Sequence, residues 1–584
     1  MILDIDYQGA KQIARDPELK PRSLSVFIFP PSLDTLLPPL QATEDRGLTP
    51  PGFFSNGKLQ VPLGVVDKPF EQRRDLLWAD FSGAAGHGAI VGGPQSGKSM
   101  MLRTMITAMA LTHTPQEVQF YCLDLGGGTL ASLENLPHVG GFASRLDVDK
   151  ARRMVAELSG LITEREQRFR AQGIDSMVEF RNRRRRGEIR DDNFGDAFLV
   201  VDGWMNFRQE FEALEPMVQA LAAQGLSYGV HVVVAANRWA EIRPAMKDLL
   251  GTRFELRLGD VSESEVDRKV AVNVPPGRPG RGLSPQKLHF LTALPRIDAS
   301  SDAENVAAGV QDMIAKVSGA WRGPRAPQVR LLPDLLPYGE FMGQVQQQRP
   351  NRGHLVPIGV NEDELAPVYL DFDADPHFMA LADGESGKTN LLRTIVRGIM
   401  TSYTSTEALI MLVDYRRTML GYIETDHLLS YAVSSAQLTD MIKDVRGSMA
   451  NRLPGPDVTQ EQLKNRSWWK GPELFVVVDD YDLVAPQGSQ NPLQPLAEFI
   501  PQAKDVGLHI VAVRRMGGAS RAMYDPILGK LKEISAPIMV GSGSKEEGSI
   551  VGNLKPSPQP PGRGTIVTRK LGQQRIQVAC IDPE

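Results

Sequence analysis

The sequence has little of what would indicate a secreted, membrane-spanning or metal-binding protein. Only two cysteines, Cys122 and Cys580, occur among 584 residues. Each lies in an apolar run, which predicts small buried side chains in a reducing compartment rather than a disulfide. No apolar run approaches the roughly 18 residues that a membrane helix needs, and the nine histidines show no ligand spacing. These shortages predict a soluble, cytosolic chain without a structural metal.

The sequence also lacks a large excess of charge of one sign. The formal net charge is only -5, which gives no global electrostatic case for binding nucleic acid or an anionic membrane. The 42% hydrophobic and 23% charged residues are ordinary for a globular protein. A chain of this length is expected to form roughly three to four domain-sized units.

What the sequence does contain is a phosphate-binding loop. The motif G-x-x-x-x-G-K-[ST] is matched by Gly92-Gly93-Pro94-Gln95-Ser96-Gly97-Lys98-Ser99. Its glycines let the backbone curl so that successive N–H groups face phosphate oxygens. Lys98 is placed to reach the β- and γ-phosphates, and the Ser99 hydroxyl to ligate Mg²⁺. With a strand expected before the loop and a helix after it, the motif predicts a site for ATP and Mg²⁺.

A second, degenerate loop occurs in the other half of the chain. It reads Ala382-Asp383-Gly384-Glu385-Ser386-Gly387-Lys388-Thr389, with alanine in place of the first glycine. Alanine fits that position if its φ is negative, so the loop is expected to work in altered form. Thr389 takes the place of the Mg²⁺-ligating serine.

The two loops belong to a repeated unit. From Lys98 to Asp124 is 26 positions, and from Lys388 to Asp414 is also 26, with each aspartate ending an apolar strand. Further apolar strands follow in both halves in the same order. Apolar strands that alternate with helices predict a parallel sheet covered on both faces. The fold class is therefore expected to be α/β, with two tandem P-loop NTPase domains of the FtsK/RecA-like kind, whose mostly parallel sheets are flanked by helices.

Composition divides the chain into four segments. These are a lead-in and linker over 1–57, a first P-loop domain over 58–317, a linker over 318–353 and a second P-loop domain over 354–584. In the lead-in, Ser23–Phe29 is strand-like and Pro38–Gly57 is expected to be an exposed connector. Each linker carries an apolar patch that is expected to dock on a neighbouring domain.

The acidic positions predict weak hydrolysis. Asp202 and Asp479 end buried strands and fit the role of the aspartate that holds Mg²⁺. An ATPase also needs a carboxylate to orient the attacking water. Gly203 provides none, and Asp480 is one methylene shorter than glutamate, so Asp479 and Asp480 are the candidate catalytic residues. We expect the first domain to bind nucleotide but to polarise water poorly, and the second to hydrolyse slowly.

Three other features each allow more than one interpretation. The basic run over 181–186 is compatible with nucleic-acid binding or with a solvated helix end, since acidic residues flank it. Trp468 and Trp469 fit a partner contact or the core. Candidates for an arginine that acts on a neighbour's phosphate are Arg253, Arg257, Arg281, Arg514, Arg515 and Arg563.

Together these residues resemble a known family. The chain is similar to tandem FtsK/SpoIIIE-like domains, and in particular to the second and third ATPase domains of the EccC proteins of type VII (ESX) secretion. The segments that carry the resemblance are Leu123-Asp124-Leu125-Gly126-Gly127-Gly128, Glu134 to Gly141, Ala223-Gln224-Gly225-Leu226, Phe254 to Asp260 and Ser467-Trp468-Trp469.

The resemblance implies an ATP-binding component of a protein secretion machine, cytoplasmic and recruited to the inner face of the plasma membrane. In that family, a membrane-anchored portion carries the first ATPase domain. The last domain, here a surface of residues 351–584, receives WXG100 (EsxA/EsxB-like) substrate dimers. Assembly into a hexameric ring and no nucleic-acid partner are further expectations.

Two alternatives differ in class. A DNA translocase of the FtsK type shares the fold, but the acidic net charge, the weakened acids and the absence of a recognisable winged-helix tail speak against it. A non-hydrolysing, nucleotide-dependent scaffold is the other, and it would be favoured if loss of Lys98 and Lys388 had no consequence.

Overall fold

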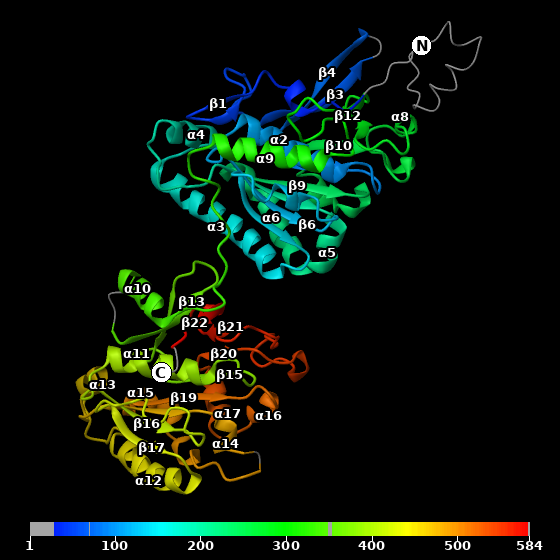
Figure 1. The fold of residues 1–584 in the computed structure, drawn as a ribbon. Helices are drawn as coiled ribbons and strands as arrows, with labels where there is room; N and C mark the ends of the chain where they lie inside the picture. Colours follow the sequence, from blue (N-terminus) through cyan, green and yellow to red (C-terminus); the bar gives the residue numbers. More distant parts are fainter. Residues whose placement is uncertain (1–28, 69–70, 349–352, 487, 582–584) are drawn as a thin grey trace. The chain divides into compact units, whose positions relative to one another are not determined.

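The chain forms two compact units that divide between Arg330 and Leu331, called unit 1 and unit 2 below. The structure is a computed structural model that describes residues 29–68, 71–348, 353–486 and 488–581 (Figure 1). Apart from Phe29, the strand expected over Ser23–Phe29 lies outside the described residues. Each unit is described by itself.

Unit 1 is built on one ten-stranded sheet. In spatial order the strands are β4 (Arg73–Asp80), β3 (Gln60–Lys68), β12 (His289–Thr292), β11 (Arg281–Leu283), β10 (Thr252–Leu256), β5 (Gly88–Val91), β9 (Val230–Ala236), β8 (Asp196–Asp202), β6 (Val118–Asp124) and β7 (Val139–Ser144). The six strands from β10 to β7 pair in parallel, and the other four are antiparallel. The predicted α/β fold with a mostly parallel sheet is confirmed.

Both faces of this sheet are covered, which explains why its central strands are apolar throughout. Every residue of β6, β8 and β9 is buried. On one face, α2 (Lys98–Thr112) and α9 (Val306–Ala320) pack in a core with Phe120 and Phe198. On the other, α3 (Val148–Gln172), α5 (Trp204–Glu210) and α6 (Glu215–Gln224) pack against Tyr121 and Leu199. Alternate residues of one strand therefore belong to different cores.

Unit 2 repeats this topology strand for strand. Its sheet has the order β14 (Pro367–Asp371), β13 (Leu355–Asn361), β22 (Gly572–Val578), β21 (Arg563–Thr568), β20 (Ile538–Val540), β15 (Phe378–Leu381), β19 (Leu508–Arg514), β18 (Glu473–Val478), β16 (Ala408–Val413) and β17 (Leu428–Ala432). Helix α11 (Lys388–Ser402) packs in a core on one face, and α12 (Ser435–Asn451) in a core on the other.

The remaining described α-helices have at most 11 residues. They are α4 (Met177–Arg185), α7 (Pro244–Lys247), α8 (Arg268–Ala271), α10 (Tyr338–Gln348), α13 (Gln460–Asn465), α14 (Tyr481–Val484), α15 (Ala503–Val506), α16 (Ala519–Ala522) and α17 (Leu528–Glu533). Within the described ranges, no helix combines the length and the hydrophobicity needed to span a bilayer.

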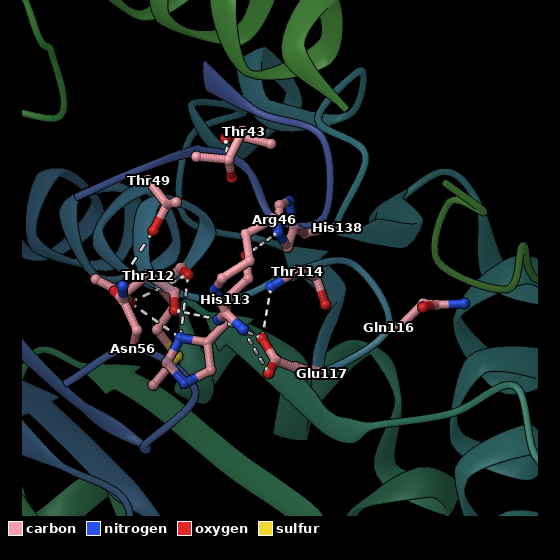
Figure 2. A network of polar contacts seen from close by, with 12 residues as sticks. Thr43, Arg46, Thr49, Asn56, Thr112, His113, Thr114, Gln116, Glu117 and His138 are labelled. Atoms are coloured by element: carbon pink, nitrogen blue, oxygen red, sulfur yellow. Dashed lines mark hydrogen bonds and ion pairs between the residues drawn. The ribbon is translucent and has the colours of Figure 1, made fainter. Parts of the chain in front are cut away.

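The prediction of an exposed connector over Pro38–Gly57 is only partly correct, because several residues such as Phe54 are exposed but the segment is folded. β1 (Gln41–Thr43) and β2 (Gly47–Thr49) form an antiparallel hairpin, and Leu48 packs against the core that contains α2. At the hairpin turn, Arg46 donates to Glu117 with Nη2 and Oε2 2.7 Å apart (Figure 2). A partly buried ion pair and an apolar contact hold a segment that its proline and glycine content suggested was an exposed connector.

Residues 326–329, called the strap below, lie along the outer edge of β7. Ala326 N–H donates to the Pro137 carbonyl at 2.9 Å, and Val329 N–H to the Gly140 carbonyl at 3.0 Å. The Tyr121 hydroxyl donates to the Pro327 carbonyl at 2.9 Å. The strap thus occupies backbone groups that an edge strand otherwise leaves unpaired.

The chain just beyond the strap packs on unit 2. Leu332, Leu336 and two residues of α10 form an apolar cluster with Val360 and Ala579. The expected docking of an apolar patch therefore occurs on unit 2 here, and the domain boundaries stay a prediction.

Candidate functional site: two phosphate-binding loops

Both predicted loops join a central parallel strand to a helix. Residues 92–97 connect β5 to α2, and residues 382–387 connect β15 to α11. Each loop contains a non-glycine residue with positive φ at the same place, Gln95 (φ 55) and Glu385 (φ 58). Such a turn directs successive N–H groups into one concavity, which is the arrangement that binds a phosphate anion at a helix N-terminus.

The two lysines lie over their own loops. Lys98 Nζ donates to the carbonyls of Gly92 and Gly93 at 2.8 and 2.9 Å, and Lys388 Nζ to that of Asp383 at 2.9 Å. Burial lowers the pKa of Lys98 from its ordinary value, while Asp202 and Glu241 oppose the shift. An ammonium held among carbonyls in a partly dry site is placed to bind a triphosphate.

The candidate Mg²⁺ donors are already paired with each other. Ser99 Oγ donates to Asp202 Oδ2 at 2.5 Å, and Thr389 Oγ1 to Asp479 Oδ2 at 2.8 Å. Burial raises the pKa of Asp202 and that of Asp479 above the ordinary value of an aspartate. A hydroxyl beside a buried carboxylate is an oxygen set that suits Mg²⁺, which takes one or two carboxylates together with phosphate oxygens. When bound, the ion would neutralise charge on the phosphates.

The strand-end aspartates that the repeat spacing singled out hold the turns beside these donors. Asp124 accepts backbone N–H bonds from Gly126, Gly127, Gly128 and Leu130. Asp414 accepts from the Met419 N–H at 2.8 Å and from the Tyr431 hydroxyl at 3.0 Å. Thr418, which the sequence reasoning missed, donates to Asp479 Oδ2 at 3.0 Å. The available signal was a repeated threonine, because Thr129 precedes Leu130 in unit 1 as Thr418 precedes Met419 in unit 2.

The replacement of glycine by Ala382 is compensated across the sheet. Ala382 has a negative φ, as the sequence analysis required. In unit 1, a Cβ on Gly92 would lie 2.7 Å from Leu256 Cβ. In unit 2, a Cβ on Gly541 would lie 2.8 Å from Ala382 Cβ. In unit 1 the glycine, Gly92, is in the loop and the larger residue, Leu256, is on the neighbouring strand. In unit 2 the alanine, Ala382, is in the loop and the glycine, Gly541, follows the neighbouring strand. The space is therefore filled in both units without a clash.

Asp480, the candidate water-orienting residue, is engaged in an ion pair. Its carboxylate Oδ2 lies 3.0 Å from Nε of Arg416. Both side chains line a pocket of about 440 Å³ together with Lys388, Thr389 and Arg515. Asp480 therefore lies beside the loop where the sequence placed it, but Arg416 competes with water for its carboxylate. Its role as a base stays a prediction.

Gly203 occupies the place of Asp480 in unit 1, and its backbone explains its identity. Its φ is 84, and a Cβ there would lie 2.9 Å from the Leu125 carbonyl carbon. We therefore expect Gly203→Glu to lower the free energy of unfolding by about 1–3 kcal/mol without raising ATP turnover. Urea denaturation and phosphate release measure the two effects.

The matched change in unit 2 is Asp480→Gly. Asp480 has φ 44, so glycine relieves a left-handed backbone and removes only a partly exposed ion pair. Stability should change by no more than about 1 kcal/mol. If Gly203→Glu were as well tolerated as Asp480→Gly, the conformational reason for the missing carboxylate would be wrong.

Most of the arginines considered as trans-acting groups serve their own unit. Arg253, Arg257, Arg514 and Arg563 donate to nearby backbone carbonyls, whereas Arg515 pairs with Asp482. Asp482, a second acid after Asp479, is thus engaged.

The two tryptophans also make contacts within their unit. Trp468 Nε1 donates to the Arg452 carbonyl and Trp469 Nε1 to that of Asp505, each at 2.7 Å. The Arg452 guanidinium stacks on the Trp469 ring. Internal packing therefore accounts for this pair.

Comparisons with known proteins agree with this geometry. The FtsK/SpoIIIE family model matches residues 56–299. An EccC protein of the ESX secretion system from Thermomonospora curvata is 53% identical over 94% of this chain, but the match covers 41% of that protein. An EccCb1 protein of the ESX-1 system from Mycolicibacterium smegmatis is 37% identical over 91% of this chain and 90% of its own. A solved structure of Thermomonospora curvata EccC, ATPases 2 and 3 with a signal sequence peptide, is 52% identical with a TM-score of 0.88, covering 96% of this chain and 100% of that one.

Two sheets of one topology, each with a P-loop and a strand-end aspartate, define a tandem P-loop ATPase of the FtsK/SpoIIIE type. The similarity over nearly all of an EccCb1 protein makes the assignment more specific. The chain belongs to the EccC family of ESX type VII secretion proteins. It spans about two fifths of the length of the first EccC relatives it matches.

Proposed function

We propose that this chain is the ATP-binding, cytoplasmic part of a type VII secretion machine in which nucleotide binding, with weak hydrolysis, controls substrate recruitment. One observation carries the nucleotide part. Both units pair a P-loop hydroxyl with a buried aspartate, yet the position after that aspartate offers no free carboxylate to water in either unit, since Gly203 has none and Asp480 is bound by Arg416. Such sites are suited to holding Mg²⁺ and ATP rather than to rapid turnover.

The proposed substrate site is the outer edge of β17 in unit 2. Its counterpart in unit 1, the edge of β7, is covered by the strap. Among the described residues no segment covers β17, and the side chains of Leu428 and Leu429 are 37% and 51% exposed. An open parallel edge beside exposed leucines can receive an extended peptide by strand addition. A related structure of EccC ATPases 2 and 3 is in complex with a signal sequence peptide, which supports peptide binding by this part of the family. For this chain we propose the export signal of a WXG100 substrate as the peptide.

The remaining partners follow from the family. We infer that the chain works with a membrane-anchored EccC portion that carries the first ATPase domain, at the inner face of the plasma membrane. Assembly into a hexameric ring with that portion would bring neighbouring P-loop units together.

Leu429→Asp tests the substrate site. A labelled peptide with the C-terminal signal of a WXG100 substrate is titrated with the chain, and binding is followed by fluorescence anisotropy. A charge on the exposed edge should weaken binding at least about 10-fold, because burying an unpaired carboxylate in the contact is costly. Binding of Mg²⁺ and ATP should not change.

Leu571→Asp is the control. Leu571 is 59% exposed in the same unit, but it lies between β21 and β22. Equal affinity of wild type and Leu429→Asp, or an equal loss in both variants, would contradict the proposed edge.

A further inference from the structure

Helix α4 and the loop after it present an excess of positive charge that the nucleotide sites do not use. Three of its arginines are neutralised within unit 1. Arg181 pairs with buried Asp196 at 2.6 Å, and the other two pair with nearby glutamates, Arg183 with Glu179 and Arg186 with Glu188. The solvated helix end considered in the sequence analysis is thus correct for part of the cluster only.

Four arginines in the same region have no carboxylate partner in the part of the chain that the structure describes. Arg184 donates to the carbonyls of Gln116 and Phe194, Arg190 to that of Gly187, and Arg325 to that of Asn135. Arg185 is exposed on α4. Backbone carbonyls accept hydrogen bonds but do not cancel the charge of a guanidinium. Partial burial lowers the pKa of Arg184 from its ordinary value, an effect that a bound anion would oppose.

Arg184, Arg190 and Arg325 line one hollow of about 470 Å³. The acid in its wall is Asp192, whose Oδ2 already lies 2.9 Å from Nε of buried Arg165. The lining therefore carries a surplus of positive charge.

Two further hollows lie nearby and share lining residues with the first or with each other. One, of about 240 Å³, shares Gln116 and Arg184 with it. Of its acids, Glu117 is held by Arg46 (Figure 2) and Asp196 by Arg181, which leaves Asp45. The other, of about 250 Å³, shares Arg181 and Arg185 with the second hollow. The three are called the arginine trough below.

We propose that the arginine trough binds an acidic peptide segment of a partner protein. Planar guanidinium groups match carboxylates in a bidentate geometry and keep their charge when partly buried. Neighbouring hollows that share arginines of one helix suit an extended chain rather than a single small ion. The walls also offer apolar surface for the side chains of a peptide, including Val178, which is 63% exposed.

A nucleic acid is a poorer match for this surface. Single-stranded binding sites stack bases on exposed aromatic rings. The aromatic residue in the trough lining is Phe180, which is fully buried beneath the guanidinium of Arg165.

Charge reversal in the full chain tests the proposal. The probe is a fluorescent peptide of alternating glutamate and leucine, with a glutamine-for-glutamate peptide as its neutral partner. Arg185→Glu/Arg190→Glu should weaken binding of the acidic probe at least 10-fold and leave the neutral probe unaffected. The control, Arg170→Glu/Arg521→Glu, makes the same change of charge at two exposed arginines elsewhere and should bind as wild type does.

Circular dichroism and nucleotide binding of both double variants establish that they are folded. Equal affinity of the two double variants for the acidic probe would overturn the proposal. So would a fluorescent single-stranded oligonucleotide that binds more tightly than the peptide and is lost in Arg185→Glu/Arg190→Glu, since the trough would then be a nucleic-acid site.

Discussion

Lys388→Ala is expected to abolish nucleotide binding in unit 2 and leave unit 1 intact, and Lys98→Ala to do the reverse. Each ammonium lies over its own loop, bonded to loop carbonyls that a phosphate would replace. Hydrogen bonds to a charged group are worth about 1.5–3 kcal/mol each. Removal of the ammonium would remove its hydrogen bonds to more than one phosphate oxygen. Affinity at the altered site should therefore fall by about 100-fold or more. Calorimetric titration of ATP with Mg²⁺ should show two sites in wild type and one in each variant.

Lys570→Ala, at an exposed lysine in the β21–β22 turn, is the control and should keep both sites. Steady-state turnover measured on the same proteins should stay near background throughout. Turnover that is rapid in wild type and lost in Lys388→Ala would show that Asp480 works as a base despite Arg416, and it would contradict the weak hydrolysis proposed here.

Acidification below neutral pH is expected to destabilise both units, because each is held by a buried neutral histidine. Val232 N–H donates to Nδ1 of His87, and Ile510 N–H donates to Nδ1 of His377, each at 2.9 Å. A proton on Nδ1 would break either bond. Burial lowers the pKa of His87 to about 4 and that of His377 to about 3.

The sign follows from proton uptake in the unfolded chain. Well above pH 6.5 these histidines are neutral in both the folded and the unfolded chain, so their contribution to stability is complete there. Between pH 6.5 and 4.5 the unfolded chain takes up protons that the folded chain refuses, which costs each unit about 2–3 kcal/mol. Urea denaturation at pH 7, 6 and 5 measures the loss.

His87→Gln/His377→Gln provides the comparison for this second prediction. The glutamine side chain can accept a hydrogen bond from the backbone N–H with its carbonyl oxygen and donate one with its amide nitrogen, and it does not titrate. The variant should be less stable than wild type at pH 7 but should lose less stability on acidification. An unchanged pH slope would show that other groups cause the acid sensitivity.

The sequence predicted the sheet well because the signal was local. Apolar strands such as Val118–Leu123 and Phe198–Asp202 are buried on both faces, and the equal spacing from lysine to aspartate in the two halves revealed the repeat. The hairpin at β1 and β2 was missed because its order comes from Arg46 and Glu117, 71 positions apart. Proline and glycine content says nothing about such a pair.

The candidate site shows the same division. The loops and strand-end aspartates lie where the motifs placed them, although their binding of ATP and Mg²⁺ stays a prediction. The exchange between Ala382 and Gly541 depends on a contact across the sheet, and the pairing of Asp480 with Arg416 depends on how two turns meet. Neither distance is encoded in spacing along the chain, so composition and motif could not reveal them.

The strap makes two similar edges behave differently through connectivity alone. It is tied to α9 by the five residues 321–325, and a short tether keeps a segment at an effective concentration of about a millimolar. If the strap had a micromolar intrinsic dissociation constant, a free peptide would bind the β7 edge about 1,000-fold more weakly in competition with it. Cutting the tether would raise the apparent affinity of the β7 edge for a free peptide, although no residue of that edge would change.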